Sequence, residues 1–228
     1  VEYFNSQDYD VILTTASLSL RLAMIAPRLK AATIGWQHNC YDGYLHVKPV
    51  VFWQQENLLQ QYLPNLDRYI VLSDYDKRDY MEKLGIDCEV KINPRSFVSE
   101  KKCDVKSKRF LMATRFVYAK GLDLMIESFE EFCKEDSEWE LDIIGDGDLF
   151  DQIRADAKKR HLEKRVHFVG YTNEPEKYYL NSSVFLLPSR WEGWPMVIME
   201  AFEFGLPVIA YHMGAMDLII DDGKTGFL

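Results

Sequence analysis

The chain has 228 residues, of which 47% are hydrophobic, and this composition is sufficient for one large or two small folded cores. Its 27 basic and 36 acidic residues give a formal net charge of -9, which disfavours general binding to nucleic acid, so any phosphate must be bound locally. No apolar run approaches the roughly 20 residues that span a bilayer, and the four cysteines are widely spaced and form no C-x-x-C pair. These features predict no transmembrane segment, zinc site or disulfide framework.

The first 98 residues alternate short β-rich runs with helix-like stretches, a pattern typical of a parallel sheet covered by helices. The expected strands are 9–14, 32–36, 68–72 and 89–92. The expected helices are 2–7, 17–30, a region around 49–62, and one that Ser73 caps and Gly85 closes in the left-handed conformation. We therefore expect residues 1–98 to form part of an N-terminal Rossmann-like domain.

Residues 99–108 are polar and rich in lysine, with few apolar side chains to bury, and this composition predicts a linker between two domains. The alternation then resumes over 109–228, with expected strands at 109–114, 139–144, 166–169, 184–187 and 207–210. A helix over 122–133 places its large apolar side chains on one face: Leu122, Met125, Ile126, Phe129 and Phe132. The fold class is therefore α/β, with two doubly wound parallel sheets.

The segment 188–207 carries the strongest chemical signal. A strand ends at Leu187, a loop containing Glu192 follows, Pro195 suits the first turn of a helix, and Gly205 ends that helix. The helix N-terminus should face the carboxyl edge of the sheet, where ligands of such sheets bind and where free N–H groups favour a phosphate. Glu200 would then lie roughly 6 Å along the helix axis, at 1.5 Å per residue.

Each of these two glutamates, taken alone, is more simply interpreted as a solvated surface acid. The neighbours of Glu200 favour a functional interpretation, because they are apolar and a buried carboxylate needs partners. They are Val197, Ile198, Met199, Ala201 and Phe202. A carboxylate at this depth in the helix could bind a ribose whose diphosphate lies at the helix N-terminus.

The loop after the expected strand 109–114 carries two cations, Arg115 and Lys120, at the same edge of the sheet. Two solvated loop charges are the simpler interpretation of these residues alone. Together they could neutralise a nucleoside diphosphate leaving group without a metal ion, arginine by a forked contact and lysine as a point charge. Stabilising the charge that grows on a leaving group is an effective catalytic strategy for glycosyl transfer.

The two segments together resemble the signature of glycosyltransferase family 4, whose members have the two-domain GT-B fold and retain the anomeric configuration. The resemblance rests on P-S-x-x-E-G-x-P-x-x-x-x-E-A, with seven residues between Glu192 and Glu200, and on R-x-x-x-x-K-G from Arg115 to Gly121. It implies that Glu192 lies by the donor sugar, Glu200 binds the ribose, and Arg115 and Lys120 hold the diphosphate. Thr114 stands where most members have glycine.

The same resemblance assigns further residues. Gly145 would line the nucleotide cleft, Gly170 and Tyr171 would lie near the base, and His38 would face the donor sugar and the acceptor. The backbone of four residues would meet the diphosphate and sugar: Trp194, Pro195, Met196 and Val197. Trp194-Pro195 replaces the Phe-Gly of many members, and the proline removes one possible backbone donor. The catalytic residues would be Glu192, Arg115, Lys120 and His38.

By their residues alone, several of these positions have simpler explanations. Gly145-Asp-Gly147 would be a turn, because a dinucleotide fingerprint requires glycine where Phe150 stands, and His38 would be a structural loop histidine. Gly223-Lys224-Thr225 is not a P-loop, since its first glycine would fall at Leu218 and a strand follows.

The resemblance implies transfer of a hexosyl unit from a nucleotide sugar, expected to be a UDP-sugar, to a glycan or lipid-linked acceptor in polysaccharide biosynthesis. No metal or other cofactor is expected. A catalytically silent nucleotide-sugar-binding or partner module of a glycosyltransferase complex is the alternative, and a GT-B sugar epimerase is a third. The chain is expected to be truncated at both ends, with half of the first domain missing before Val1. We expect a cytoplasmic protein that contacts the membrane peripherally through this missing part.

Overall fold

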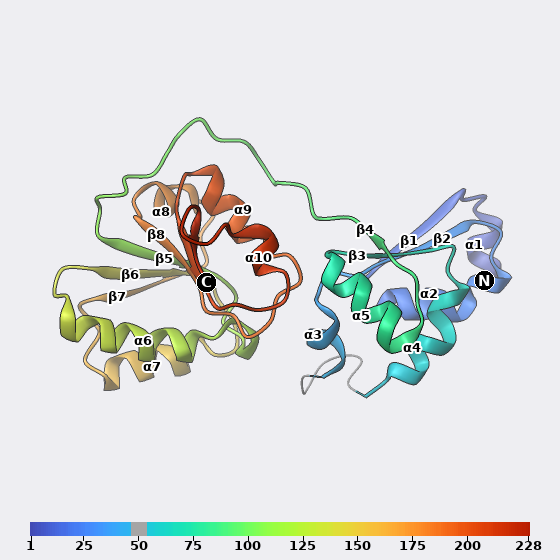
Figure 1. Cartoon of the computed structure of the whole chain (residues 1–228), viewed down its shortest axis with the longest axis horizontal. Coiled ribbons are helices and arrows are strands. Elements are labelled where there is room, and N and C mark those ends of the chain that lie inside the picture. Colours follow the sequence, from blue (N-terminus) through green and yellow to red (C-terminus); the bar gives the residue numbers. More distant parts are fainter. Residues whose placement is uncertain (47–53) are drawn as a thin grey trace. The chain divides into compact units, whose positions relative to one another are not determined.

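A computed structural model describes residues 1–46 and 54–228 (Figure 1). The chain forms two compact units. The first comprises Val1–Pro94 and Trp191–Trp194, and the second comprises Arg95–Arg190 and Pro195–Leu228. Residues 99–108, which the sequence marks as a linker, belong to the second unit. Within the described ranges, no helix combines the length and the apolar composition needed to cross a bilayer.

The first unit contains a parallel sheet of four strands in the order β1-β2-β3-β4. Its strands are β1 (Val11–Thr15), β2 (Ala32–Trp36), β3 (Arg68–Val71) and β4 (Glu89–Val90). The predicted strands are confirmed to within two residues at their ends. Because all neighbours are parallel, the loops that follow the strands emerge at one edge, and the residues after Trp36 and Val71 lie there.

The helices of the first unit are α1 (Glu2–Ser6), α2 (Leu18–Ile25), α3 (Tyr41–Leu45), α4 (Glu56–Tyr62) and α5 (Asp74–Leu84), with 3₁₀ turns at Ala26–Arg28 and Leu63–Asn65. Helices α2, α4 and α5 lie along one face of the sheet (Figure 1). The predicted helix 17–30 is shorter, because Pro27 lacks the N–H that an α-helix would use there. Of the predicted helix around 49–62, residues 49–53 lie outside the described residues.

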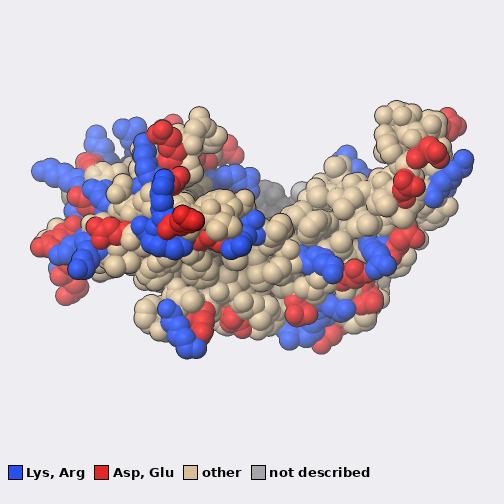
Figure 2. All heavy atoms as spheres, turned by 90° about the horizontal axis from the view of Figure 1, so that it is seen from above, with Lys and Arg blue, Asp and Glu red and all other residues tan. Residues whose placement is uncertain are grey.

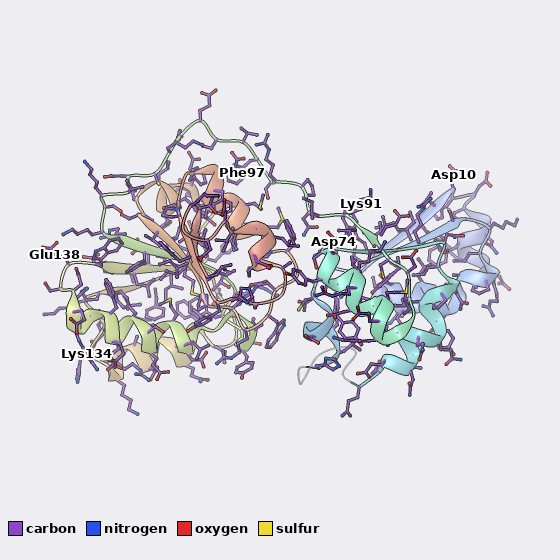
Figure 3. All side chains as sticks on the ribbon, viewed as in Figure 1. Asp10, Asp74, Lys91, Phe97, Lys134 and Glu138 are labelled. Carbon is purple, nitrogen blue, oxygen red and sulfur yellow. The ribbon has the colours of Figure 1, made fainter. Side chains whose placement is uncertain are left out.

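Two local features show how the sequence sets these boundaries. Ser73 caps α5, since its Oγ accepts a hydrogen bond from the Asp76 N–H at 3.1 Å, and Asp74, labelled in Figure 3, begins the helix. Gly85 closes α5 with a φ of 69°. Both predictions are confirmed. Helix α3 was not predicted; it has one turn and is capped by Cys40, whose Sγ accepts the Gly43 N–H.

The second unit contains a parallel sheet of six strands in the order β10-β9-β8-β5-β6-β7. The strands are β5 (Arg109–Ala113), β6 (Glu140–Ile144), β7 (Val166–Gly170), β8 (Val184–Leu187), β9 (Val208–Ala210) and β10 (Gly226–Phe227). From β5 the chain runs outward to β6 and β7, and then crosses back to pair β8 on the other side of β5. Open α/β sheets bind ligands at such a reversal, outside the carboxyl ends of the strands.

Helices cover both faces of this sheet. Those of the second unit are α6 (Leu122–Glu135), α7 (Phe150–Lys159), α8 (Glu176–Leu180), α9 (Met196–Glu203) and α10 (Met216–Ile219). Helices α6 and α7 pack into one apolar cluster, and α8, α9 and α10 pack into another, on opposite faces of the sheet (Figure 1). The predicted apolar face of α6 is confirmed. The doubly wound α/β fold predicted from the sequence is therefore present.

Candidate functional site

Two loops meet at the point where the strand order of the second sheet reverses. The loop from β5 to α6 carries Arg115 and Lys120, and it touches the loop that follows β8. A Cβ added to Gly121, whose φ is 64°, would lie 1.9 Å from the Pro188 carbonyl oxygen, so this approach requires glycine. The Arg190 N–H also donates to the Ala119 carbonyl oxygen at 2.7 Å.

Arg190 fastens these two loops through its side chain as well. Its guanidinium donates to both Asp123 carboxylate oxygens, at 2.8 and 2.6 Å, and to the Tyr118 carbonyl oxygen at 3.0 Å. The guanidinium carbon also lies 4.0 Å from the centre of the Tyr118 ring. These hydrogen bonds hold the pKa of Asp123 below its ordinary value. Arg190 was not predicted as a site residue, although it stands inside the motif that begins at Pro188.

The loop after β6 packs against the loop between β5 and α6. Gly145 has a φ of 125°, and a Cβ there would lie 1.8 Å from the Thr114 carbonyl oxygen. Its N–H donates to the Gly170 carbonyl oxygen at 2.9 Å, and the Phe116 N–H donates to the Asp146 carbonyl oxygen at 2.9 Å. The backbones of residues 114 and 145 therefore approach each other closely, and it is Gly145 that must lack a side chain there. The threonine side chain at position 114 is compatible with this approach.

Most predicted donor-binding residues of the second unit lie along this edge. Arg115 is exposed, and Lys120 is half-buried at the end of a 3₁₀ turn, Tyr118–Lys120. Gly170 ends β7 with a φ of 79°, and the Tyr171 side chain that follows it is 77% exposed. The fold thus brings two cations and two glycines, Gly145 and Gly170, to one edge, as the sequence indicates. Their contacts with a donor stay a prediction.

Helix α9 begins at this edge. Pro195 precedes the helix as its N-cap residue, with φ -70° and ψ 108°, which corrects the prediction that it lies in the first turn. Met196 and Val197 follow, and their N–H groups have no acceptor within the helix, because an α-helix leaves its first N–H groups unpaired. The Ile198 N–H donates to the Pro195 carbonyl oxygen at 3.1 Å. The first N–H groups of α9 therefore point toward this edge of the sheet.

Glu200 lies on the second turn of α9 and is partly buried. Its Oε2 accepts a hydrogen bond from the Tyr179 hydroxyl of α8 at 2.9 Å. Burial raises the pKa of Glu200, while the hydrogen bond from Tyr179 opposes that rise. The apolar surroundings of Glu200 predicted that this carboxylate would need a partner. They did not indicate which residue this would be.

A cavity of about 1040 Å³ opens beside Glu200, at the upper limit of the size range of ligand pockets. It lies between α8, α9 and the segment that leads into β5. Its walls are formed by Phe97, Val98, Ser99, Glu100, Lys101, Asn173, Glu174, Pro175, Glu176, Lys177, Tyr179, Leu180, Glu200 and Phe204.

The segment that lines this cavity is fastened to the C-terminal end of α9. Glu203 accepts hydrogen bonds from the Arg95 guanidinium at 2.9 Å and from the Ser99 N–H at 3.2 Å. Phe97, labelled in Figure 3, packs against Phe204 with ring centres 5.4 Å apart. Residues that the sequence assigns to the end of the first domain and to the linker therefore pack on the helix that carries Glu200.

The remaining predicted residues belong to the first unit. His38 follows β2 and is exposed. Its ring centre lies 5.1 Å from that of Trp36, and partial burial lowers the pKa of the imidazole. Glu192 is buried within the short stretch Trp191–Trp194. The indole N–H groups of Trp36 and Trp194 are buried with no hydrogen-bond partner among the described residues.

Buried side chains organise the carboxyl edge of the first sheet. Gln37 accepts a hydrogen bond from the Tyr69 hydroxyl at 2.8 Å. Asp76 accepts one from the Tyr41 N–H at 2.8 Å and one from the Ser73 hydroxyl at 2.7 Å, and burial raises its pKa. The sequence identified the cap at Ser73 but not this network.

The described residues contain no group of three or more His, Cys, Asp or Glu side chains that could hold a metal ion. On the face drawn in Figure 2, acidic and basic side chains are interspersed. The expectation of metal-independent chemistry stays a prediction.

A parallel sheet with cationic and glycine-containing loops at its reversal point, and a helix N-terminus beside them, is the arrangement by which open α/β sheets bind phosphate-containing ligands. The family model for glycosyl transferases group 1 matches residues 96–228, which is more than half of the chain. The chain belongs to this family.

Among curated proteins, the chain is 29% identical over 225 residues to an uncharacterized glycosyltransferase of Haemophilus influenzae, covering 96% of this chain and 61% of that protein. It is 28% identical to the poly(ribitol-phosphate) alpha-N-acetylglucosaminyltransferase of Staphylococcus aureus, covering 78% of this chain and 36% of that protein. The chain therefore spans less than two thirds of the length of both relatives.

Among solved structures, the chain resembles a mutant of S. aureus TarM in complex with Fondaparinux, alpha-GlcNAc-glycerol and UDP. The TM-score is 0.76 at 24% identity, over 87% of this chain and 40% of that chain. At this identity the likeness establishes the GT-B fold, and the fold prediction is confirmed.

Proposed function

We propose that this chain forms the donor-binding part of a retaining glycosyltransferase that moves a hexosyl unit from a nucleotide sugar to a glycan or lipid-linked acceptor. One observation carries the proposal: the loop with Arg115 and Lys120 and the N-terminus of α9 lie at one carboxyl edge of the second sheet, at the reversal of strand order, and Glu200 lies about one turn further along α9. Membership of the glycosyl transferases group 1 family supports it.

The diphosphate of the donor would bind between the two cations and the start of α9. Arg115 and Lys120 supply positive charge, and the first N–H groups of α9 point along the helix axis toward the anion. Negative charge grows on the β-phosphate as the glycosidic bond breaks, so these groups stabilise the transition state more than the bound substrate. In this proposal they act without a metal ion.

Glu200 would bind the ribose. The carboxylate lies about one turn inside α9, which matches the separation between a diphosphate at the helix N-terminus and the ribose attached to it. An ionised carboxylate accepts hydrogen bonds from two adjacent hydroxyl groups, and such charge-assisted bonds are stronger than neutral ones.

Glu192 and His38 would orient the sugar in the assembled enzyme. The bond between the anomeric carbon and the phosphate oxygen breaks, the bond to the acceptor oxygen forms on the same face, and the acceptor proton passes to the departing phosphate. Because the leaving group takes this proton, the reaction needs no separate protein base. Retention of configuration follows from attack on the face from which the phosphate leaves.

We propose UDP as the nucleotide. The support comes from the structural neighbour TarM, whose complex contains UDP, and from the relative named as an alpha-N-acetylglucosaminyltransferase that acts on poly(ribitol-phosphate). A glycan or polyol-phosphate polymer is therefore the favoured class of acceptor. A lipid-linked acceptor would additionally require peripheral contact with a membrane surface.

The test uses the full-length protein with a panel of nucleotide sugars, and measures transfer, hydrolysis and the anomeric configuration of the product. Arg115→Ala and Lys120→Ala should each lower kcat by about 100-fold, since each removes a charge that stabilises the leaving group. Lys134→Ala is the matched control, because Lys134, labelled in Figure 3, is an exposed lysine at the far end of α6. Binding of a nucleotide sugar without transfer or hydrolysis would favour the silent module, and formation of an epimerised nucleotide sugar would favour the epimerase.

The ribose assignment has its own test. Glu200→Ala should lower the affinity for UDP by about tenfold or more, measured by isothermal titration calorimetry, because it removes a charged acceptor. Unchanged affinity would refute the role of Glu200 and leave the roles of the two cations standing.

A further inference from the structure

The side chain of Glu200 makes a single hydrogen bond within the described residues, and its donor is Tyr179. The bond joins Oε2 to the tyrosine hydroxyl at 2.9 Å, and so fixes one oxygen of the carboxylate. The other oxygen, Oε1, receives no protein donor there. A carboxylate held by one oxygen in this way keeps the second for a ligand, provided that the donor itself cannot move.

The Tyr179 ring is held firmly. The residue is 1% exposed. Its ring stacks against Phe185 of β8 and Phe204 at the end of α9, with ring centres 5.8 and 5.2 Å apart and interplanar angles of 7° and 24°. Aromatic stacking on two sides leaves the hydroxyl little freedom, because rotating the ring would break both contacts. The core of the second unit therefore fixes the direction of the bond to Glu200.

The other charges around the cavity are partly paired with one another. Lys101 contacts Glu176 at 2.7 Å, and Lys177 contacts Glu174 at 3.3 Å. The ionisable groups that line the cavity together with Glu200 are Glu100 and Lys101 of the segment before β5, Glu174, Glu176 and Lys177 of α8 and its preceding loop, and Tyr179. Burial and the Tyr179 hydrogen bond are the two causes that set the pKa of Glu200.

We propose that Tyr179 is a positioning residue of the donor site: its hydroxyl holds Oε2 of Glu200, so that Oε1 faces the cavity and accepts hydrogen bonds from the vicinal hydroxyls of the donor ribose. This inference rests on the function proposed above. Tyr179 acts through Glu200 and does not itself touch the donor.

The hydrogen bond has a second effect, on the charge of Glu200. A donor to the ionised carboxylate favours that form, so Tyr179 opposes the rise in pKa that burial causes. Without the hydroxyl, the pKa of Glu200 rises further. The carboxylate then protonates at a higher pH. In a plot of UDP affinity against pH, the low-pH limb, where affinity falls as Glu200 protonates, therefore moves to higher pH.

The experiment compares Tyr179→Phe with Tyr178→Phe in the full-length protein. Both remove one hydroxyl from α8, and phenylalanine keeps the ring that stacks at position 179. We expect Tyr179→Phe to weaken UDP binding by about fivefold to tenfold at neutral pH. It should also move the low-pH limb of binding to higher pH, and raise the KM for the donor with little change in kcat. Tyr178→Phe should match the wild type in all three measurements.

A double-mutant cycle with Glu200→Gln separates this role from a structural one. The glutamine cannot ionise, so in its presence the substitution of Tyr179 should no longer shift the pH profile, and the two losses of affinity should not add. Additive losses, or a Tyr179→Phe protein with wild-type affinity and pH profile, would overturn the inference. If Tyr179→Phe does not fold, difluorotyrosine can be incorporated at position 179 instead. Its more acidic hydroxyl is a stronger hydrogen-bond donor to Glu200. It should then move the low-pH limb downward, and an unmoved limb refutes the proposal.

The two proposals fail in different ways. If Glu200→Ala leaves UDP affinity unchanged, the ribose assignment is wrong and Tyr179 has no role in the donor site. If Glu200→Ala weakens binding while Tyr179→Phe does not, the ribose assignment stands and the positioning role of Tyr179 is refuted.

Discussion

The loops at the carboxyl edge of the second sheet make close backbone contacts, to which the Arg190 side chain adds, whereas buried side chains connect the elements at the same edge of the first sheet. In the second unit, the Arg190 N–H bonds to the Ala119 carbonyl oxygen. In the first unit, Tyr69 donates to Gln37, and Asp76 accepts from a backbone N–H. Backbone hydrogen bonds do not titrate, while a buried carboxylate does. The second edge should thus be most sensitive to added bulk at Gly121, and the first edge should respond to the protonation of Asp76.

Gly121→Ala should break the second edge most severely. The new methyl group would overlap the Pro188 carbonyl oxygen, and the φ of 64° disfavours any side chain. We expect a loss of about 3 kcal/mol or more in the free energy of unfolding, measured by chemical denaturation. Gly85→Ala is the control, because Gly85 has a φ of 69° with no atom within 4 Å of the added Cβ, and it should cost about 1 kcal/mol. Equal losses would show that backbone strain, and not the contact between loops, sets the requirement at position 121.

Arg190→Ala tests how much the side-chain contacts of Arg190 add to the backbone contacts between the two loops. The variant loses the paired hydrogen bonds to Asp123 and the contact with the Tyr118 ring, but keeps the backbone bond to Ala119. We expect a loss of about 1 kcal/mol by the same measurement. Lys224→Ala, which removes an exposed pair with Asp221, should cost less. A loss for Arg190→Ala as large as that for Gly121→Ala would mean that the side chain organises the two loops.

The smallest effect is a pH dependence in the first unit. Because burial raises the pKa of Asp76 above 3.8, its favourable contribution is complete at low pH and falls as pH rises through the folded-state pKa. Asp76→Asn removes this titration. The stability of the wild type relative to Asp76→Asn should therefore decrease as the pH rises above about 4, as followed by hydrogen exchange of α3 and α5. Asp74→Asn, an exposed change in the same helix, is the control, and a flat difference for Asp76→Asn would contradict the expectation.

Local patterns sufficed to predict the strands, the caps of α5 and the depth of Glu200, because each depends on residues close in sequence. The cap at Ser73 needs only the backbone three residues later, and the place of Glu200 follows from the rise of a helix. The Trp194-Pro195 departure was harder to interpret, since whether Pro195 precedes or begins α9 depends on a single residue at a helix boundary.

The partners of the site residues could not be predicted in this way. Tyr179 meets Glu200 only because α8 and α9 lie on the same face of the sheet, and the two residues are 21 positions apart. Arg190 reaches Asp123 across 67 positions, because β8 returns to pair with β5. A single sequence contains no periodic signal for such contacts, since they follow from the order of strands.

The segment before β5 is bonded to Glu203 of α9, and this contact affects where two proteins of this family should be joined to make a chimaeric enzyme. Arg95 and Ser99 belong structurally to the second unit, and Phe97 and Val98 line the cavity beside Glu200. A graft that joined a foreign first domain at Arg109 would exchange one wall of that cavity along with the domain. A junction placed ahead of Arg95 would transfer the wall and the helix it packs on as one piece.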